Sequence, residues 1–400
     1  MLKIALLNSV CGSGSTGKIC VGIGMLLNKY GIDHKIFYTY GKSDYPKSSC
    51  YSNNRAIRVQ GLKSRILGNY GFNSQKATSV LISKLKEYQP NIVHIHNIHG
   101  HDCNLEMLFN YLRKEKIKIV WTFHDCWAFT GYCTYFTMCG CNKWKSGCGK
   151  CPQKNTYSWL FDKSASNYAR KKKIFSGLDL TIVTPSKWLA NLVKESFLKA
   201  YPVHVINNGI DLSVFKPTDN RFRKENKLEN KTILLGVSFE WEKRKGLDVF
   251  MELAKQLSKQ LQIVLVGTNE KLDKLLPANI ISVHRTQSSQ ELADIYSSAD
   301  FLINPTREEN FPTVNIESIA CGTPVLTFNT GGSIEMLDET CGDFVETGDR
   351  DKLFEMIKNY SNEKKFKSID CIKKAEYYDM KKTYSRYVDL YNSILQKGEL

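Results

Sequence analysis

The sequence has no long apolar run. No stretch within its 400 residues approaches the about 20 apolar residues that a membrane-spanning helix needs. The apolar start, residues 1–10, is too short for the core of a signal peptide and leads directly into a glycine-rich loop, so it predicts a strand. Helix-turn-helix, zinc-finger and RNP signatures of nucleic-acid binding are absent as well. We therefore expect a cytoplasmic protein that does not act on nucleic acid.

The excess positive charge lies in one half of the chain. Residues 1–200 hold 29 Lys and Arg against 10 Asp and Glu, a net +19, whereas residues 201–400 hold 27 against 30, a net −3. This asymmetry predicts two domains with different partners. An anionic membrane surface fits the basic half at least as well as nucleic acid, since each basic residue near such a surface contributes about 1 kcal/mol. Residues 55–67 interleave basic and apolar side chains, which indicates either an amphipathic membrane element or a solvated helix face.

Apolar strands alternate with helices along both halves. The expected strands are residues 3–8, 34–40, 91–96, 118–123, 180–185, 203–206, 232–238, 262–267, 301–306 and 324–328. The expected helices are 19–29, 74–88, 107–114, 247–260, 290–299, 315–320 and 373–395, with another opening at Ser186. Such alternation predicts an α/β fold with parallel, doubly wound sheets.

Two glutamates lie near the end of the strand expected at 301–306. Glu309 lies in the loop that follows it, and Glu317 lies in what we expect to be the first turn of the next helix, which Gly322 closes. A helix N-terminus binds anions, and a carboxylate accepts hydrogen bonds from both hydroxyls of a diol. The site therefore favours a sugar bound through its diphosphate. The simpler alternative is that Glu309 is a solvated loop residue and Glu317 an ordinary residue at a helix N-terminus.

The string from Glu309 to Glu335 resembles the E-x7-E motif of the retaining glycosyltransferases of family 4. It reads ENFP, then ESIACGTPV, then two glycines and a final glutamate. The resemblance implies a GT-B fold, with two Rossmann-like domains facing across a cleft. By resemblance Glu309 faces the donor sugar and Glu317 the ribose of the nucleotide. The residues expected to complete this donor site are Asn310, Phe311, Pro312 and Thr313.

Two further segments match the family's phosphate-binding parts. The sequence from Gly12 to Lys18 looks like a P-loop, but Ile19 stands where a Mg²⁺-binding Ser or Thr is needed, so an NTPase is disfavoured. The family has a glycine-rich loop here, contacting donor phosphates and acceptor, and Gly14, Thr16 and Gly17 are carried over to it.

The family also places an arginine and a Lys-Gly pair after the first strand of the second domain. Lys245 matches, Ser238 occupies the usual arginine position, and Arg244 is expected to substitute. A solvated charge run is the alternative for this segment. Arg285 is expected near the nucleotide.

Histidines and cysteines cluster in the first half. Four histidines, at 94, 96, 99 and 101, surround the third expected strand, but no third metal ligand stands at a recognised spacing. His124 resembles the family's strand-end histidine that faces donor sugar and acceptor, with Asp125 placed to orient its ring.

Six cysteines fall within residues 126–151. We expect Cys133, Cys139, Cys148 and Cys151 to hold a structural Zn²⁺, with Cys141 as a competing ligand and free thiols as the alternative.

Together with the alternation of strands and helices, the resemblance implies three parts. Residues 1–205 would form an acceptor-binding Rossmann-like domain with a Cys-rich insertion at 126–153, and residues 206–375 a nucleotide-sugar-binding Rossmann-like domain. By resemblance, residues 376–400 are a helix that crosses back to the first domain. The resemblance implies a retaining hexosyl transfer from a nucleotide-diphosphate sugar to a saccharide, or to a polyprenyl-diphosphate-linked saccharide, in bacterial surface polysaccharide synthesis. No cofactor is then required for catalysis, and peripheral contact with the inner face of the cell membrane is expected. The alternatives are a nucleotide-sugar 2-epimerase on the same fold and a non-enzymatic protein that binds anionic surfaces or nucleic acid.

Overall fold

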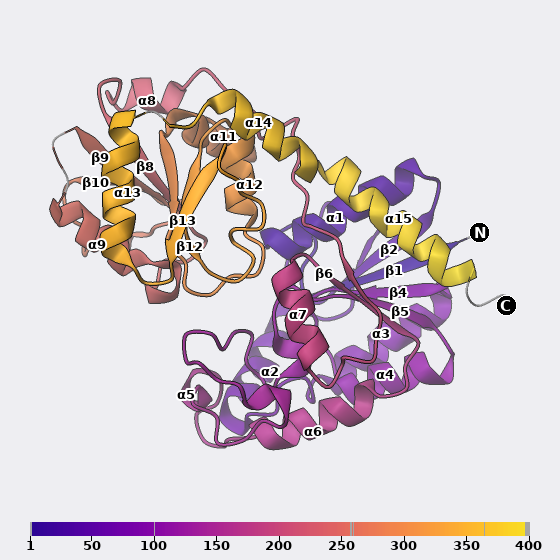
Figure 1. The fold of residues 1–400 in the computed structure, drawn as a ribbon. Coiled ribbons are helices and arrows are strands. Elements are labelled where there is room, and N and C mark those ends of the chain that lie inside the picture. Colours follow the sequence, from indigo (N-terminus) through magenta and orange to yellow (C-terminus); the bar gives the residue numbers. More distant parts are fainter. Residues whose placement is uncertain (1, 100, 257, 259, 364, 397–400) are drawn as a thin grey trace. The chain divides into compact units, whose positions relative to one another are not determined.

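The computed structural model describes residues 2–99, 101–256, 258, 260–363 and 365–396, and it divides into two compact units (Figure 1). Unit 1 comprises Met1–Asn207 with Tyr384–Leu400, and unit 2 comprises Asn208–Thr383. The first division falls two residues after the position expected at 205. The C-terminal segment joins unit 1 from Tyr384, eight residues later than expected.

Unit 1 is built on a seven-stranded parallel sheet in the order β3-β2-β1-β4-β5-β6-β7. The strands are β1 (Lys3–Asn8), β2 (Asp33–Tyr38), β3 (Ser48–Cys50), β4 (Ile92–Ile95), β5 (Lys118–Thr122), β6 (Leu180–Thr184) and β7 (Val203–Val205). The main helices are α1 (Gly14–Lys29), α2 (Asn54–Leu67), α3 (Gln75–Tyr88), α4 (Leu105–Lys114), α5 (Lys154–Tyr157), α6 (Ser164–Phe175) and α7 (Lys187–Glu195). The strand order reverses between β1 and β4, and ligands of doubly wound sheets bind beyond the carboxyl ends of the strands at such a point.

Unit 2 repeats the design with a six-stranded parallel sheet in the order β10-β9-β8-β11-β12-β13. Its strands are β8 (Thr232–Val237), β9 (Leu261–Val266), β10 (Ile280–Val283), β11 (Phe301–Asn304), β12 (Val325–Asn329) and β13 (Gly342–Glu346). Its helices include α8 (Arg221–Glu225), α9 (Leu247–Gln256), α10 (Glu270–Asp273), α11 (Ser289–Ser298), α12 (Thr313–Ala320), α13 (Arg350–Glu363) and α14 (Ser368–Ala375). Here the order reverses between β8 and β11. Of the helix expected at 247–260, residues 257 and 259 lie outside the described residues.

The predicted α/β class with two parallel sheets is confirmed, and every expected strand is present. The three strands that were missed are β3, β10 and β13, each the outermost strand at an edge of its sheet. Most side chains of these three strands are only partly buried. In β3 and β13 polar residues also interrupt the apolar run by which the central strands were recognised.

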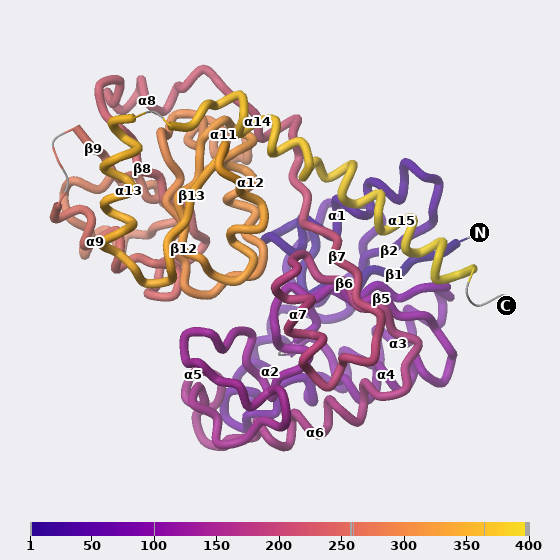
Figure 2. Tube along the Cα trace, viewed as in Figure 1, coloured from indigo at the N-terminus to yellow at the C-terminus, as the bar shows by residue number. Residues whose placement is uncertain are grey.

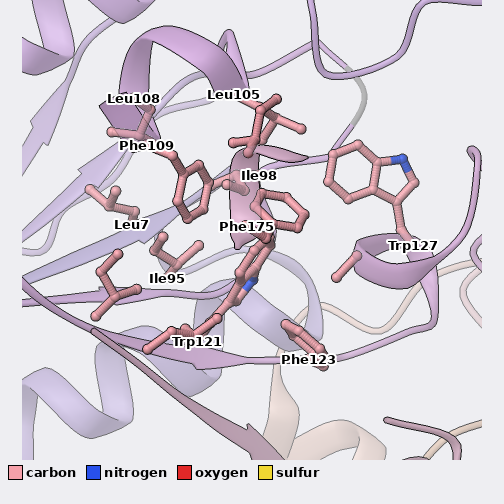
Figure 3. Close-up of a cluster of buried hydrophobic side chains, with 14 of the residues drawn as sticks. Leu7, Ile95, Ile98, Leu105, Leu108, Phe109, Trp121, Phe123, Trp127 and Phe175 are labelled. Atoms are coloured by element: carbon pink, nitrogen blue, oxygen red, sulfur yellow. The ribbon is translucent and has the colours of Figure 1, made fainter. Parts of the chain in front are cut away.

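Aromatic side chains fill the core of unit 1. Figure 3 shows residues from β1, β4, α4, β5 and α6 converging, with Trp121 among them. The Trp121 ring meets Phe123 and Phe175 edge-on, at centroid distances of 5.0 and 5.1 Å. Its indole N–H donates to the His96 carbonyl at 3.0 Å. Burying each large side chain contributes about 1.5–3 kcal/mol to stability. Through the Trp121 bond to His96, this cluster also holds the turn that follows β4.

The C-terminal segment is broken rather than one continuous helix. After α14 comes a single 3-10 turn, η4 (Glu376–Tyr378), and then α15 (Met380–Gln396). Asp379 causes the break, because its backbone is not helical (φ −55°, ψ 123°) and its carboxylate accepts from the Lys381 N–H at 2.9 Å at the start of α15. From Tyr384 onward α15 belongs to unit 1 and buries Tyr387 and Tyr391 there. Among the described residues no helix is both long and apolar enough to cross a membrane.

Candidate active site

The centre of the site in unit 2 is an ion pair between the loops that follow β8 and β11. Lys245 ends a 3-10 turn, η3 (Lys243–Lys245), and its Nζ lies 2.5 Å from the Glu309 Oε2. The Asn310 N–H donates to Glu309 Oε1 at 3.0 Å. Burial raises the pKa of Glu309, but the Lys245 ammonium, the Asn310 N–H and the Arg244 charge outweigh it, and the net pKa is lowered. Glu309 is therefore a fixed anion at neutral pH, at the switch point of the sheet.

Two glycines with positive φ allow these loops to approach each other. Gly246 has φ +77°, and a Cβ there would lie 2.5 Å from the Pro305 carbonyl oxygen. Gly331 has φ +57°, and a Cβ there would lie 1.8 Å from the Glu309 carbonyl oxygen. Only glycine fits either position without moving the backbone. Gly331, which follows the motif in the sequence, thus packs against the backbone of Glu309.

Helix α12 begins at Thr313, two residues earlier than expected, so Glu317 is not in its first turn. Pro312 precedes the helix, and the Asn315 N–H already bonds to the Pro312 carbonyl at 3.2 Å. Glu317 is half-buried, and its Oε2 accepts from the Tyr296 hydroxyl at 3.0 Å. Tyr296 was not anticipated from the sequence, because a tyrosine at a buried helix position usually reads as core.

The residues expected to complete the donor site divide into two groups. Asn310 and Phe311 are 2% and 4% exposed, and the Phe311 ring meets Tyr378 edge-on. They support the loop, and Pro312 is buried beside them. Thr313 is half-buried at the first position of α12, where backbone N–H groups have no partner within the helix.

Arg244 lies beside the pair, as expected. Its Nε is 2.8 Å from Glu242 Oε1, and one terminal nitrogen donates to the Glu308 carbonyl at 3.4 Å. The sequence did not reveal Arg307, whose guanidinium donates to both carboxylate oxygens of Asp248, at 2.7 and 2.8 Å. The backbone N–H of Arg307 donates to the Arg244 carbonyl at 2.8 Å. Arg285 is exposed after the edge strand β10, which β9 separates from β8, so the structure does not bring it to the Lys245–Glu309 pair.

In unit 1 the glycine-rich loop follows β1 and opens α1. The helix begins at Gly14, five residues before the expected start, so the predicted loop residues Gly14, Thr16 and Gly17 form its first turn. Gly17 packs against the loop, where a Cβ would lie 3.2 Å from the Gly12 nitrogen. The Asn8 side chain donates to the Thr16 hydroxyl at 3.3 Å. The loop thus presents the N-terminus of a 16-residue helix, which suits an anion.

Histidines lie beyond the ends of β4 and β5. His96 Nδ1 and His124 Nε2 are 3.0 Å apart, and the two rings stack. Burial lowers the pKa of His124 to about 4, so the ring is neutral at pH 7. The Asp125 carboxylate binds His99 Nε2 at 3.1 Å and the Trp127 N–H at 2.8 Å. That Asp125 orients the His124 ring stays a prediction.

The buried His94 is held by the C-terminal helix. Its ring nitrogens bond to the Tyr391 hydroxyl at 2.6 Å and the Thr122 hydroxyl at 2.8 Å, and Tyr387 adds a bond to Thr122 at 3.1 Å. The tyrosines of this helix were visible in the sequence, but their partners are about 300 positions away and could not be assigned.

The expected zinc ligands are only partly brought together. Cys133, Cys148 and Cys151 line one small cavity, but Cys139 is exposed, and its thiol donates to the Phe136 carbonyl at 3.2 Å. Cys141 lines the cavity in its place. Within the described ranges no group of three or more His, Cys, Asp or Glu side chains is already arranged to hold a metal ion.

Solved structures share this two-unit architecture. Sucrose-phosphate synthase from Thermosynechococcus elongatus matches with a TM-score of 0.72 at 16% identity, covering 99% of this chain and all of that one. Anabaena Alr3699/HepE, solved in complex with UDP-glucose, matches with a TM-score of 0.69 at 12% identity, covering 98% and 100%. At these identities the likeness shows the fold alone, and the fold is GT-B.

Two family models then identify the chain. The model of Glycosyltransferase Family 4 matches residues 26–214, and that of Glycosyl transferases group 1 matches residues 230–363. Together they cover most of the sequence, and the chain belongs to glycosyltransferase family 4. Among curated relatives, the glycosyl transferase WcaC of Escherichia coli K12, provisionally assigned to colanic acid biosynthesis, is 24% identical over 263 residues. That match spans 63% of each protein, so the chain covers less than two thirds of this relative.

Proposed function

We propose that this chain is a retaining glycosyltransferase that moves a hexosyl group from a nucleotide-diphosphate sugar to a saccharide in polysaccharide or glycolipid synthesis. The observation that carries the proposal is the Lys245–Glu309 pair, which stands on the two loops that flank the switch point of the unit 2 sheet. A cation and a fixed carboxylate side by side match the two needs of the substrate, a diphosphate and a sugar. Family membership supports the reaction class.

The difficult step is the departure of an anionic nucleoside diphosphate from an oxocarbenium-like carbon. We assign the stabilisation of that leaving group to Lys245, to Arg244 and to the N-terminus of α12, which are positive groups already in place before reaction. Glu309 would bind hydroxyls of the donor sugar. Glu317, held by Tyr296, would accept from the ribose diol through its carboxylate. Neutral His124 and the opening of α1 are the groups that unit 1 offers to the sugar and to phosphate.

The acceptor is proposed to be lipid-linked, because unit 1 carries an exposed aromatic patch beside its basic helix. Trp159, Leu160 and Phe161 are 54%, 61% and 50% exposed. They follow α5, which lies beside α2 (Figure 2). The Trp159 N–H donates to the Arg65 carbonyl at 2.7 Å near the end of α2. Val59 and Leu62 of α2 are also exposed, at 47% and 52%, among the basic residues of that helix. Apolar tips among basic residues suit an anionic membrane surface.

The roles of the two glutamates are tested by substitution and kinetics. After the donor is identified by thermal shift with a set of nucleotide sugars in the presence of EDTA, we expect Glu309→Gln to lower kcat and Glu317→Gln mainly to raise the donor KM. Glu355→Gln, an exposed change on α13, serves as the control. Wild-type kinetics in both site variants would refute the assignment. Turnover without any acceptor would favour an epimerase instead.

A further inference from the structure

Four half-buried cysteines gather at one edge of the unit 1 core. Cys133, Cys141, Cys148 and Cys151 all pack against it, and all four line one cavity of about 20 Å³. A cavity of that size holds about one water-sized sphere. The other two cysteines of the segment differ, since Cys126 is fully buried in the core and Cys139 is exposed. The segment thus offers four thiols around space for one small occupant.

The distance between two of these thiols excludes a disulfide and is compatible with two ligands of one zinc ion. Cys133 Sγ and Cys151 Sγ are 3.8 Å apart. A disulfide requires about 2.05 Å, and the two thiols are far from that. Two thiolates on one tetrahedral zinc, each at about 2.3 Å from the ion, lie about 3.8 Å from each other. The pair already has the separation of two ligands of one zinc ion.

The surroundings of the thiols suit a site with net negative charge. The Gly131 N–H donates to Cys148 Sγ at 3.3 Å. A Cβ at Gly131 would lie 2.6 Å from the Ser164 carbonyl oxygen, so only glycine lets the chain pack this closely on Ser164. Nearby Lys171 is fully buried and donates to the Trp127 and Thr130 carbonyls, at 2.6 and 3.1 Å. Among the described residues no carboxylate forms an ion pair with it.

We propose that Cys133, Cys141, Cys148 and Cys151 together bind one structural Zn²⁺, and that Cys139 is not a ligand. Binding replaces four S–H bonds by four Zn–S bonds and releases four protons, which leaves a centre of net charge −2 beside Lys171. Because the described side chains do not yet surround one point, side chains among the four cysteines must change rotamer as the ion enters. The inference is independent of the proposed sugar transfer.

Such a centre would cross-link the segment that follows the histidine site. Cys126 N–H donates to the Thr134 carbonyl at 2.9 Å, and Cys151 N–H donates to Asp162 at 2.7 Å. The metal would therefore tie the turn bearing Asp125 and Trp127 to the start of α6. We expect it to stabilise unit 1 and to take no part in the reaction.

The test uses the full-length chain, purified without chelator, and measures bound zinc by mass spectrometry of the metal. We expect about one zinc per chain, as the proposal states, and loss of that zinc in Cys141→Ser. Cys139→Ser, in the same segment, is the matched control and is expected to keep its zinc. A variant that fails to fold would not weaken the test, because the wild-type chain reconstituted with Co²⁺ must show the visible bands of tetrahedral cobalt thiolate. No bound zinc and no such bands would overturn the proposal, and so would zinc loss in Cys139→Ser equal to that in Cys141→Ser.

Discussion

At the residue scale, Asp102 shows most clearly how burial opposes the ionisation of a carboxylic acid. Its carboxylate is 3% exposed and accepts from the Ser9 and Thr39 hydroxyls, at 3.0 and 2.9 Å. Burial raises the pKa of Asp102 to about 6, and His99 and the two hydroxyls only partly oppose it. Ser9 directly follows β1, and its hydroxyl also lies within hydrogen-bond distance of the Asn97 carbonyl, 3.0 Å away. This network therefore joins the ends of β1 and β4.

Asp102→Asn is expected to make the chain less sensitive to pH. A pKa raised in the folded state contributes stability below the unfolded value, near 4, that is lost as pH rises through about 6. A shift of that size corresponds to about 3 kcal/mol at pH 7, since one unit is about 1.4 kcal/mol. Urea unfolding at pH 4.5 and pH 7 should therefore show wild type losing about 2 kcal/mol relative to Asp102→Asn over that interval. An unchanged difference between the two proteins would contradict the burial argument.

At the element scale, the loops of unit 2 depend on backbone positions that only glycine can occupy. The sequence placed Gly331 after the motif but gave no reason for it. The structure supplies one, because the loop after β12 returns against the Glu309 carbonyl, and the Gly332 N–H donates to the Asn310 carbonyl at 2.9 Å. The geometry of the carboxylate is thus set by a segment more than twenty residues away.

Gly331→Ala is expected to displace the Glu309 loop and to weaken donor binding. Gly348→Ala provides the control, because it has a positive φ of +91° but nothing within 4 Å of the added Cβ. The control pays only the conformational cost, about 1 kcal/mol, whereas Gly331→Ala adds a clash with backbone. Chemical denaturation and donor titration of both variants measure the difference. Equal effects in the two would mean that the close approach to Glu309 is unimportant.

At the scale of the whole molecule, charge and exposed apolar area coincide on unit 1. The sequence carries its net charge of +19 in residues 1–200. The fold brings α2, from that basic half, next to Trp159 through the bond to Arg65. The aromatic patch was not expected from the sequence, because three apolar residues in a row more often mark core.

Vesicle binding tests this surface. We expect the wild-type chain to sediment with vesicles containing phosphatidylglycerol but not with pure phosphatidylcholine, and salt to weaken the binding. The double change Trp159→Ser and Phe161→Ser should lower affinity at least about tenfold, since burying one such side chain contributes about 1.5–3 kcal/mol. Leu275→Ser, which removes an equally exposed apolar side chain from unit 2, should have no effect. Equal binding of both proteins to anionic vesicles would show that charge alone holds the chain at the membrane. Failure of the wild-type chain to bind would exclude the proposed membrane contact.

The sequence alone determined the alternation of strands and helices and the Glu309 motif with its Lys-Gly partner. Each of these is encoded in apolar periodicity or in a short spacing, which acts over a few residues. Tertiary structure alone decided that Asp125 binds His99, that Tyr391 holds His94, and that Cys141 replaces Cys139 at the cavity. Those choices depend on strand order and on the paths of loops, and they pair residues whose separation along the chain carries no local signal.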